Sequence, residues 1–415
     1  MNPVRSNKSQ IYADSRMSRT SDGMKILIAG YPYIRENYLN TFKFYPEKDK
    51  VFFLLPKIWK VKKGKVIFKP PEEPNIFKTP AFFHHSFYPI IGGLLKGWMP
   101  AIPLFLLKNR KRFDLVYNCS EPVLLTTLYN SLWIKLFGFK NIIFSWENIP
   151  YNQKFKGISR LIKEMILKLN ILFCDGIICG NKKGFEILRK IVKKPMSIIS
   201  MSGVDTNFFA PPDKNGKDRR FKDINLNGKI VFTFAGAVDY RKGIHLILES
   251  LKGVLTELPN SFFVIAGSGE YEKEIDGLTE RLGLKNYVLR VPWLNRSELK
   301  ELLSVSDVFL YPSLPFKGWE EQFGYSMAEA SLMELPVVSS RSGSINEIVI
   351  DDKTGILIES GDTNELKEAM IRLGKDGSLR DSLGKAGREY IAGNFSYKIV
   401  AQKFYDFFHN FFENQ

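Results

Sequence analysis

The stretch IVFTFAGAVDYRKG, residues 230–243, joins a strand pattern to a glycine and two cations. Residues 230–234 are β-branched or aromatic, which predicts a buried strand. Similar runs alternate with helical patterns along the chain, and this alternation is typical of a parallel sheet wound with helices. Ligands of such α/β folds bind at the carboxyl ends of the strands. We therefore expect Gly236, Arg241 and Lys242 to lie at a binding edge.

Apolar runs on both sides of this stretch predict further strands of two α/β units. The predicted strands are Lys25–Ala29, Val51–Leu55, Leu115–Asn118, Asn141–Ser145, Gly176–Cys179, Ser197–Ser200, Ile230–Phe234, Ser261–Ala266, Tyr287–Leu289, Val308–Tyr311, Pro336–Ser339 and Gly355–Ile358. Apolar residues recur at helical spacing in Leu124–Phe137 and Ser159–Phe173, so helices are predicted there.

The length of 415 residues predicts two domains, because single cores stop growing at about 250–300 residues. Residues 210–228 are rich in Pro, Asn, Gly and charge, which is typical of an exposed linker. The predicted divisions are a disordered tail 1–23, a first α/β domain 24–209, the linker 210–228, a second α/β domain 229–394 and a C-terminal helix 395–415 docking across both.

The composition is near the average for a folded protein, with 44% hydrophobic and 25% charged residues. Three cysteines without metal-ligand spacing indicate a reducing compartment and no metal site. Residues 1–200 hold 34 Lys and Arg against 13 Asp and Glu, whereas residues 201–415 hold 26 against 31. The basic half suggests an anionic partner, for which a membrane surface, nucleic acid and an anionic acceptor are candidates. Solvated lysines without a partner are the alternative.

Membrane signals are weak in the sequence. Residues 1–23 lack the apolar core of a secretory signal. Phe87–Leu107 is the most membrane-like stretch, but glycines, prolines and a lysine interrupt it, so we expect it to be interfacial at most. These features predict a cytoplasmic protein, with peripheral binding to the inner face of the plasma membrane as an open alternative.

The densest chemical signal is EQFGYSMAE, residues 321–329, in which two glutamates flank a Phe323-Gly324 turn. Gly324 lets backbone N–H groups approach a ligand, and the following helix presents its positive end to that ligand. A carboxylate there can accept hydrogen bonds from sugar hydroxyls. Glutamate is also a common residue at helix N-termini, which is the structural alternative.

Two basic residues and several glycines follow neighbouring strands. Arg241 and Lys242 are suited to binding a diphosphate, although a surface turn with solvated cations gives the same pattern. Gly267-Ser-Gly269 is a weak glycine-rich loop by itself. Gly343–Glu347 opens another helix, where Glu347 is either a ligand contact or a cap. The sequence has no Asp-x-Asp, so the usual carboxylate pair for a nucleotide-bound Mg²⁺ is lacking.

These motifs resemble glycosyltransferase family 4, the glycosyl transferases group 1, of the GT-B fold. The resemblance is carried, in order, by Ser202–Phe209, Gly236–Gly243, Ala266–Gly269, Tyr311–Ser313, Glu321–Glu329, Pro336–Val338, Gly343–Glu347, Thr354–Gly355 and Asn394–Ser396. It implies two Rossmann-like domains facing across a cleft.

The resemblance implies roles for the motif residues. Glu321 would hold the donor sugar, Phe323 and Gly324 would offer it backbone N–H groups, and Glu329 would bind the ribose. Arg241 and Lys242 would neutralise the diphosphate. The remaining donor-binding residues would be Gly30, Gly236, Gly267, Gly269, Gln322 and Tyr325.

The chain departs from the family at three places. Ala237 stands where the family usually has an arginine, which makes Lys242 the firmer diphosphate ligand. The segment Leu314–Glu320 resembles only part of the family and is expected to shape the sugar pocket. Glu147 follows a strand where members often have a histidine, so it is the acceptor-side candidate, with loop capping as the alternative. Arg35, after Gly30, would touch phosphate or acceptor.

We therefore expect a retaining glycosyltransferase that moves a hexosyl group from a nucleotide sugar to a glycan or lipid-linked acceptor, without cofactor or metal, in cell-surface polysaccharide or glycolipid synthesis. Four aromatic residues among lysines suit an anionic membrane interface: Trp59, Phe87, Trp98 and Phe105. A non-catalytic nucleotide-sugar-binding scaffold subunit is the alternative. Nucleic-acid binding is disfavoured because no recognition module is visible.

Overall fold

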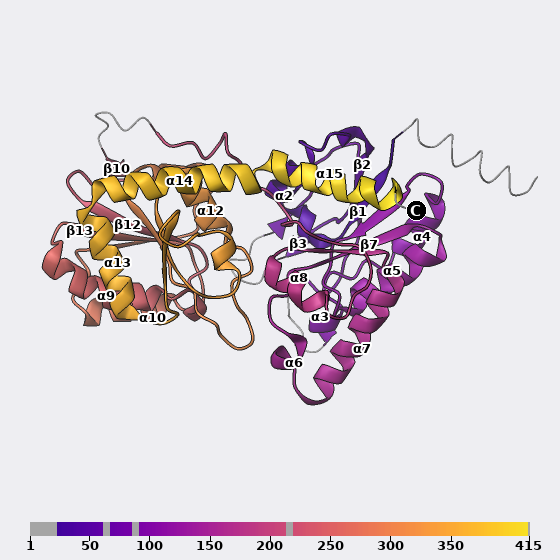
Figure 1. The fold of residues 1–415 in the computed structure, drawn as a ribbon, viewed down its shortest axis with the longest axis horizontal. Coiled ribbons are helices and arrows are strands. Elements are labelled where there is room, and N and C mark those ends of the chain that lie inside the picture. The colour runs from indigo at the N-terminus through magenta and orange to yellow at the C-terminus, as the bar shows by residue number, and fades with distance from the viewer. Residues whose placement is uncertain (1–22, 61–66, 85–90, 213–218, 414–415) are drawn as a thin grey trace, which may run out of the picture.

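The computed structural model describes residues 23–60, 67–84, 91–212 and 219–413, and the side chains of residues 91, 92, 412 and 413 are outside the description. Predictions that concern residues 1–22 and Phe87 therefore lie outside the described residues. Two α/β domains stand side by side, and each is built on its own parallel sheet (Figure 1). The predicted fold class is confirmed.

The first sheet has seven parallel strands in the order β5-β2-β1-β6-β7-β8-β9. Its strands are β1 Ile26–Ala29, β2 Val51–Pro56, β5 Ile76–Thr79, β6 Leu115–Asn118, β7 Lys140–Ser145, β8 Gly176–Cys179 and β9 Met196–Ile198. The helices are α2 Glu36–Phe42, α3 Ile91–Leu94, α4 Ile102–Lys108, α5 Leu125–Leu136, α6 Tyr151–Lys154, α7 Gly157–Phe173 and α8 Lys182–Leu188. An antiparallel pair, β3 Trp59–Lys60 and β4 Ile67–Phe68, and the strand β5 were not predicted.

The second sheet has six parallel strands in the order β14-β13-β12-β15-β16-β17. Its strands are β12 Ile230–Ala235, β13 Ser261–Ala266, β14 Val288–Val291, β15 Val308–Tyr311, β16 Val337–Ser340 and β17 Gly355–Ile358. The helices are α9 Ile244–Glu257, α10 Glu272–Arg281, α11 Arg296–Ser304, α12 Tyr325–Leu332, α13 Thr363–Lys375 and α14 Gly377–Phe395.

Each sheet has a switch point, which is a central strand whose two neighbours in the sheet are reached by connections running in opposite directions. In the first sheet β1 lies between β2 and β6. In the second sheet β12 lies between β13 and β15. Helices cover both faces of a parallel sheet, which explains why every residue of β13 is buried. The open crevices lie at the carboxyl ends of these central strands, where α/β folds bind ligands.

The stretch predicted to be an exposed linker contributes to the second core. Within the described part of residues 210–228, β10 Arg220–Phe221 and β11 Ile224–Asn225 form a small antiparallel hairpin. The side chains of Phe221 and Leu226 are each 1% exposed and pack in the core of the second domain. This difference arises because two apolar residues outweigh the polar composition around them once a neighbouring core can bury them.

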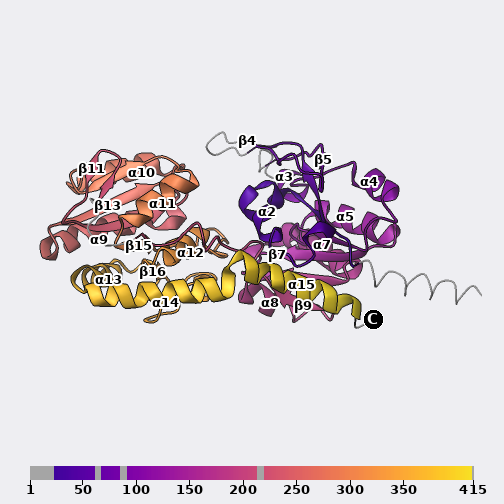
Figure 2. The same ribbon diagram turned by 90° about the horizontal axis from the view of Figure 1, so that it is seen from above.

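The chain returns to the first domain at its end. Helix α14 runs along the second domain, and α15, Tyr397–Glu413, continues onto the first (Figure 2). The aromatic side chains of Phe404 and Phe408 are fully buried in the first-domain core, against Tyr117 among others. A bridge between Val204 and Ser396 brings the two crossings of the chain together.

Candidate active site

A buried ion pair lies at the switch point of the second domain. Lys242 follows β12 on a short 3-10 helix, and Tyr311 ends the neighbouring strand β15. The Lys242 ammonium donates hydrogen bonds to the Tyr311 hydroxyl and to the Glu321 carboxylate, and its side chain is 7% exposed. Burial lowers the pKa of Lys242, while the charge of Glu321 opposes that change. Lys242 and Glu321, both predicted site residues, are thus brought together.

Arg241 lies beside this pair, against an aromatic ring. Its guanidinium carbon is 3.7 Å from the centroid of the Trp319 ring, and Nη2 is 3.4 Å from the Asp239 carboxylate. The Nη1 atom is buried and has no hydrogen-bond partner among the described residues. An unpaired buried N–H group is costly, and a phosphate oxygen is the acceptor that a guanidinium binds best. The local geometry therefore favours an anionic ligand at Arg241.

Close backbone contacts require glycine around the cations. A Cβ atom on Gly267, which has φ +142°, would lie 1.8 Å from the Gly236 carbonyl oxygen. A Cβ on Gly269 would lie 2.2 Å from the Val238 carbonyl oxygen. The loops after β12 and β13 are therefore pressed together at the carboxyl edge of the sheet, and Gly236, Gly267 and Gly269 keep this edge free of side chains.

The motif of residues 321–329 surrounds the N-terminus of α12. Gly324 has φ +80° and precedes the first turn, and no hydrogen bond to another described residue engages the backbone N–H groups of Phe323 and Gly324. Gln322 is half-buried between the buried Glu321 and Phe323. Two N–H groups at the positive end of a helix are suited to an anionic or hydroxylated ligand.

The two other predicted residues of this motif point to different places. Glu329 lies in the last turn of α12, where burial raises its pKa to about 7 and the charge of Arg296 opposes the rise. The Tyr325 hydroxyl instead donates to the Ser202 carbonyl oxygen at 3.3 Å and accepts from the Ser202 N–H at 3.2 Å. The side chain of Tyr325 is thus used to join the two domains.

The first domain places two carboxylates at the ends of β6 and β7. Glu147 is 4% exposed, and its Oε2 atom is 2.6 Å from the Lys154 ammonium. Glu121, which sequence reasoning missed, accepts hydrogen bonds from the Trp146 N–H at 2.8 Å and the Ser145 hydroxyl at 3.1 Å. Burial, followed by the charge of Glu147, raises the pKa of Glu121 to about 7. A carboxyl group that titrates near neutrality is suited to proton exchange with a hydroxyl.

We expect Glu121→Gln to change the pH dependence of stability. A carboxyl whose pKa is raised from 4.5 to about 7 adds stability that is full below pH 4.5 and is lost as the pH rises through 7. Glutamine does not ionise, so the variant should gain stability relative to the parent between pH 5 and 8. Urea unfolding across this range measures the difference. Parallel profiles would contradict the assignment, and Glu280→Gln, on the exposed face of α10, serves as control.

Contacts across the cleft bring the two sets of residues together. The Asn148 side-chain amide donates to the Glu321 carbonyl oxygen at 2.8 Å, so the loop after β7 touches the motif that holds the buried pair. The Glu347 carboxylate accepts from the Lys182 N–H at 2.9 Å. Glu347 therefore contacts the start of α8, in the opposite domain. Glu147, next to Asn148, lies on the side of the cleft that faces the second-domain site.

The loop after β1 is also at the carboxyl edge of its sheet. A Cβ atom on Gly30 would lie 2.6 Å from the Cys119 sulfur, which explains the glycine by packing between β1 and β6. Arg35 is exposed, with its guanidinium carbon 5.9 Å from the Tyr38 ring and 5.7 Å from the Phe68 ring. Neither residue contacts the Lys242–Glu321 pair through a hydrogen bond or ion pair that the structure describes.

Three residues of the site were not singled out individually from the sequence: Glu121, Tyr311 and Trp319. Glu121 had a signal, because it is a carboxylate that follows a strand. Trp319 lies in the 314–320 segment that we expected to shape the pocket, and a bridge between Phe316 and Trp319 closes that segment into a tight turn. Its ring is placed by this turn over Arg241, 5.2 Å from the Lys242 ammonium as well.

The two domains and the site between them define a GT-B protein, with Rossmann-like domains facing across a cleft. Solved structures agree: HepE of Anabaena, described in complex with UDP and glucose, superposes with a TM-score of 0.71 at 15% identity over 94% of this chain and 100% of that one. Sucrose-phosphate synthase of Thermosynechococcus elongatus superposes with a TM-score of 0.70 at 16% identity, covering 95% and 100%. At these identities the likeness shows the fold.

The second domain is the part of the chain that matches a family model. Residues 216–390 match the family model of glycosyl transferases group 1. A curated Escherichia coli relative, UDP-Gal:alpha-D-GlcNAc-diphosphoundecaprenol alpha-1,3-galactosyltransferase, is 25% identical over 73% of this chain and 77% of its own length. A GDP-mannose-dependent alpha-(1-6)-phosphatidylinositol monomannoside mannosyltransferase of Mycolicibacterium smegmatis is 28% identical over 47% and 52%. These matches support glycosyltransferase activity.

Proposed function

We propose that the protein is a retaining glycosyltransferase that moves a hexosyl group from a nucleotide sugar to a glycan or lipid-linked acceptor in the cytoplasm. The observation that carries the proposal is the buried Lys242–Glu321 pair beside Arg241, whose Nη1 atom has no hydrogen-bond partner among the described residues, at the carboxyl edge of β12 and β15. The match of residues 216–390 to glycosyl transferases group 1 supports the reaction class.

In this proposal the bond between the anomeric carbon and the diphosphate oxygen breaks, and a bond from that carbon to the acceptor oxygen forms on the same face. The nucleoside diphosphate leaves, and the proton of the acceptor hydroxyl passes to a phosphate oxygen of this leaving group. Lys242 and Arg241 stabilise the charge that develops on the leaving group, which is the main rate term of such a site. No metal or further cofactor takes part in the proposed reaction.

The carboxylates of the second domain have distinct proposed roles, and those of the first domain lie on the acceptor side. Glu321 accepts hydrogen bonds from the donor sugar and keeps Lys242 in place through their ion pair. Glu329, in the last turn of α12, accepts from the ribose hydroxyls. On the acceptor side, Glu147 and Glu121 lie behind the loop that touches the Glu321 backbone through Asn148. Closure of the two domains then orients donor and acceptor and excludes water.

A thermal-shift panel of UDP-, GDP-, ADP- and dTDP-sugars tests the donor assignment. One nucleotide sugar should raise the stability of the protein, by about 2.7 kcal/mol when its concentration is 100 times Kd. Glu329→Ala should abolish that shift, because the ribose loses its acceptor, whereas Glu274→Ala on the exposed face of α10 should keep it. Incubation with the active donor should release its nucleoside diphosphate.

Two results would count against this proposal. A folded protein that none of the donors stabilises has no donor site of the proposed kind. A protein that binds a donor but never releases nucleoside diphosphate, with or without lipid-linked acceptors, is a binding subunit and not an enzyme.

A further inference from the structure

Helix α7 carries an exposed apolar stripe along its outer face. The large hydrophobic residues of this helix recur at spacings of three, four and seven, which places them on one side of it. They are Ile158 at 77% exposure, Leu161 at 66%, Ile162 at 39%, Met165 at 56% and Leu172 at 65%. Exposed apolar side chains are common singly, but five on one helix face form a patch that needs an explanation.

The opposite face of α7 is already used by the core. Ile166 and Leu167 are buried, and the Asn170 amide donates to the Pro122 carbonyl oxygen at 2.9 Å. The Lys163 ammonium donates to the Val123 carbonyl oxygen at 3.1 Å. These contacts fix the orientation of α7 about its own axis, so the stripe cannot turn inward without breaking them.

The surroundings of the stripe are basic. Residues 151–173, which include α6 and α7, hold five Lys and Arg against one Glu. Lys156 and Lys168 are exposed next to the stripe, and the Lys194 ammonium donates to the Leu172 carbonyl oxygen at 2.9 Å at the C-terminal end of the helix. A helix that combines an apolar face with flanking lysines is suited to an anionic lipid surface.

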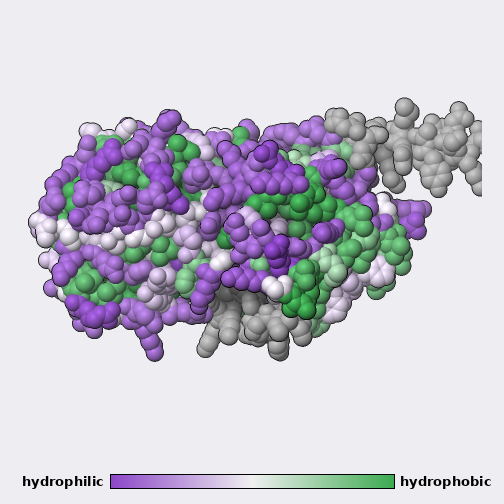
Figure 3. All heavy atoms as spheres, turned by 60° about the horizontal axis from the view of Figure 1, so that its bottom comes forward, coloured by the Kyte–Doolittle hydropathy of each residue, from purple (hydrophilic) through white to green (hydrophobic). Residues whose placement is uncertain are grey.

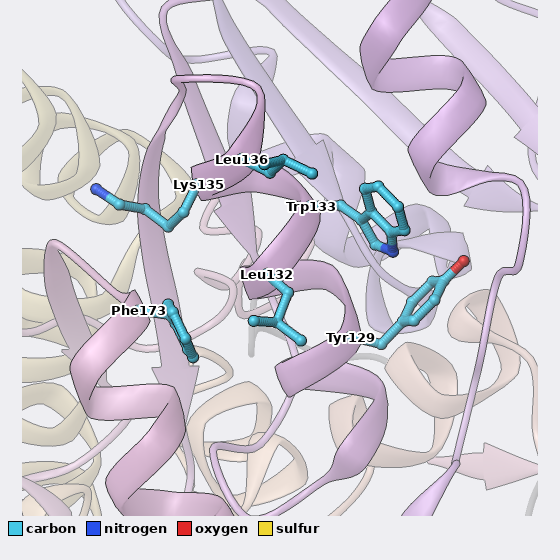
Figure 4. Close-up of a pocket in the computed structure, with 6 residues that line it drawn as sticks. All are labelled: Tyr129, Leu132, Trp133, Lys135, Leu136 and Phe173. Carbon is cyan, nitrogen blue, oxygen red and sulfur yellow. The ribbon is translucent and has the colours of Figure 1, made fainter.

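An apolar groove lies at the C-terminal end of α7. Its volume is about 490 Å³, and Phe173, the neighbour of Leu172, contributes one wall. Figure 4 shows its six lining residues, Tyr129, Leu132, Trp133, Lys135, Leu136 and Phe173, around the end of α5 and the adjacent helix. Figure 3 shows broad hydrophobic areas on the first domain, to the right, and a more hydrophilic second domain.

We propose that the α7 stripe, defined as Ile158, Leu161, Ile162, Met165 and Leu172, binds in the plane of an anionic lipid bilayer. In-plane binding fits the finding that no helix of the described residues is long and apolar enough to cross a membrane. Trp59, one of the aromatic residues that the sequence suggested for this purpose, fits less well, because its side chain is 4% exposed and stacks on Tyr31.

The stripe begins beside the acceptor side of the cleft. Ile158 follows α6 by four residues, and Lys154 at the end of α6 pairs with Glu147. Figure 1 shows α6 and the first turns of α7 together at the lower edge of the first domain. Resting on proposed glycosyl transfer, this position would present the cleft to an acceptor whose head group projects from the lipid surface. The lipid binding itself does not depend on that activity.

Flotation with lipid vesicles tests the proposal on the full chain without donor. Vesicles of equal parts phosphatidylcholine and phosphatidylglycerol should carry the protein, whereas phosphatidylcholine alone should carry far less. Leu161→Ser combined with Met165→Ser should weaken the association by about tenfold or more, because apolar contact is lost. Both side chains are exposed, so the melting temperature should stay unchanged.

The matched control is Leu104→Ser combined with Leu107→Ser, on α4, at 56% and 48% exposure. This variant should float like the parent. The proposal is overturned if the parent ignores anionic vesicles, if the α7 variant floats like the parent, or if both double variants lose binding equally. It is also overturned if the parent is a dimer that the α7 variant converts to a monomer, because a second copy would then cover the stripe. Donor binding in the thermal-shift panel is a separate readout.

Discussion

Replacing Lys242 with methionine should reduce the rate of nucleoside diphosphate release by about 10²–10³-fold, the usual loss when one preorganised charge donor is removed from a reacting site. Methionine is an unbranched side chain one atom shorter than lysine, and it leaves the Glu321 carboxylate buried without its cation. Breaking a buried pair in this way costs about 3–5 kcal/mol of unfolding free energy. The variant should therefore be both slow and unstable, as initial rates and urea unfolding will show.

A double variant separates the two effects. Lys242→Met with Glu321→Gln removes both buried charges, so stability should return toward that of the parent while activity stays low. Lys252→Met, at an exposed position on α9, controls for the loss of a lysine from the same domain and should change neither quantity. Parent-like rates in the single variant would exclude Lys242 from the reaction and leave it a structural role only.

Replacing Gly243 with alanine should lower the unfolding free energy by about 2–5 kcal/mol. Gly243 has φ +69°, which costs an L-residue about 1–2 kcal/mol, and its Cβ would lie 2.0 Å from the Pro312 carbonyl oxygen. Relief of that overlap requires backbone movement, which adds about 1–3 kcal/mol. Because Gly243 directly follows Lys242, the same movement should displace the buried ammonium and reduce donor binding.

Gly283→Ala is a matched control for the backbone strain. Gly283 has φ +70°, and nothing lies within 4 Å of a Cβ placed there. Its replacement should cost about 1–2 kcal/mol, the strain alone. Urea unfolding of the two variants therefore separates strain from the clash at Pro312. Equal losses in the two variants would show that the carbonyl contact of Gly243 has no energetic weight.

The central strands could be predicted from the sequence because each is an uninterrupted apolar run, as in β13 and β15. The edge strand β5 could not, because its four residues include a lysine and follow a proline-rich stretch. The hairpin in the predicted linker was missed for a related reason. Its two buried residues, Phe221 and Leu226, are isolated among polar ones, and only contact with the second core explains them.

The sequence predicted individual residues of the site but not which of them contact each other. The sequence placed Lys242 after a strand and Glu321 before a helix, but their ion pair joins residues 79 positions apart and depends on β15 lying next to β12. The raised pKa of Glu121 likewise follows from burial and from the charge of Glu147, which lies after a neighbouring strand, whereas the hydrogen bonds from Ser145 and Trp146 oppose the rise. Such pairings follow from strand order, which short motifs do not encode.

The bridge between Val204 and Ser396 also limits how the two domains can move. Both crossings of the chain meet at this bridge, and a Cβ atom on Gly203 would lie 2.6 Å from the Tyr397 backbone nitrogen. Two chain connections at one place act as a hinge, so the domains can rotate about it but cannot separate there. Opening of the cleft must also break the hydrogen bonds that cross it, such as the one from Asn148 to Glu321. The cleft therefore opens by rotation of one domain against the other, from an arrangement that these hydrogen bonds hold closed.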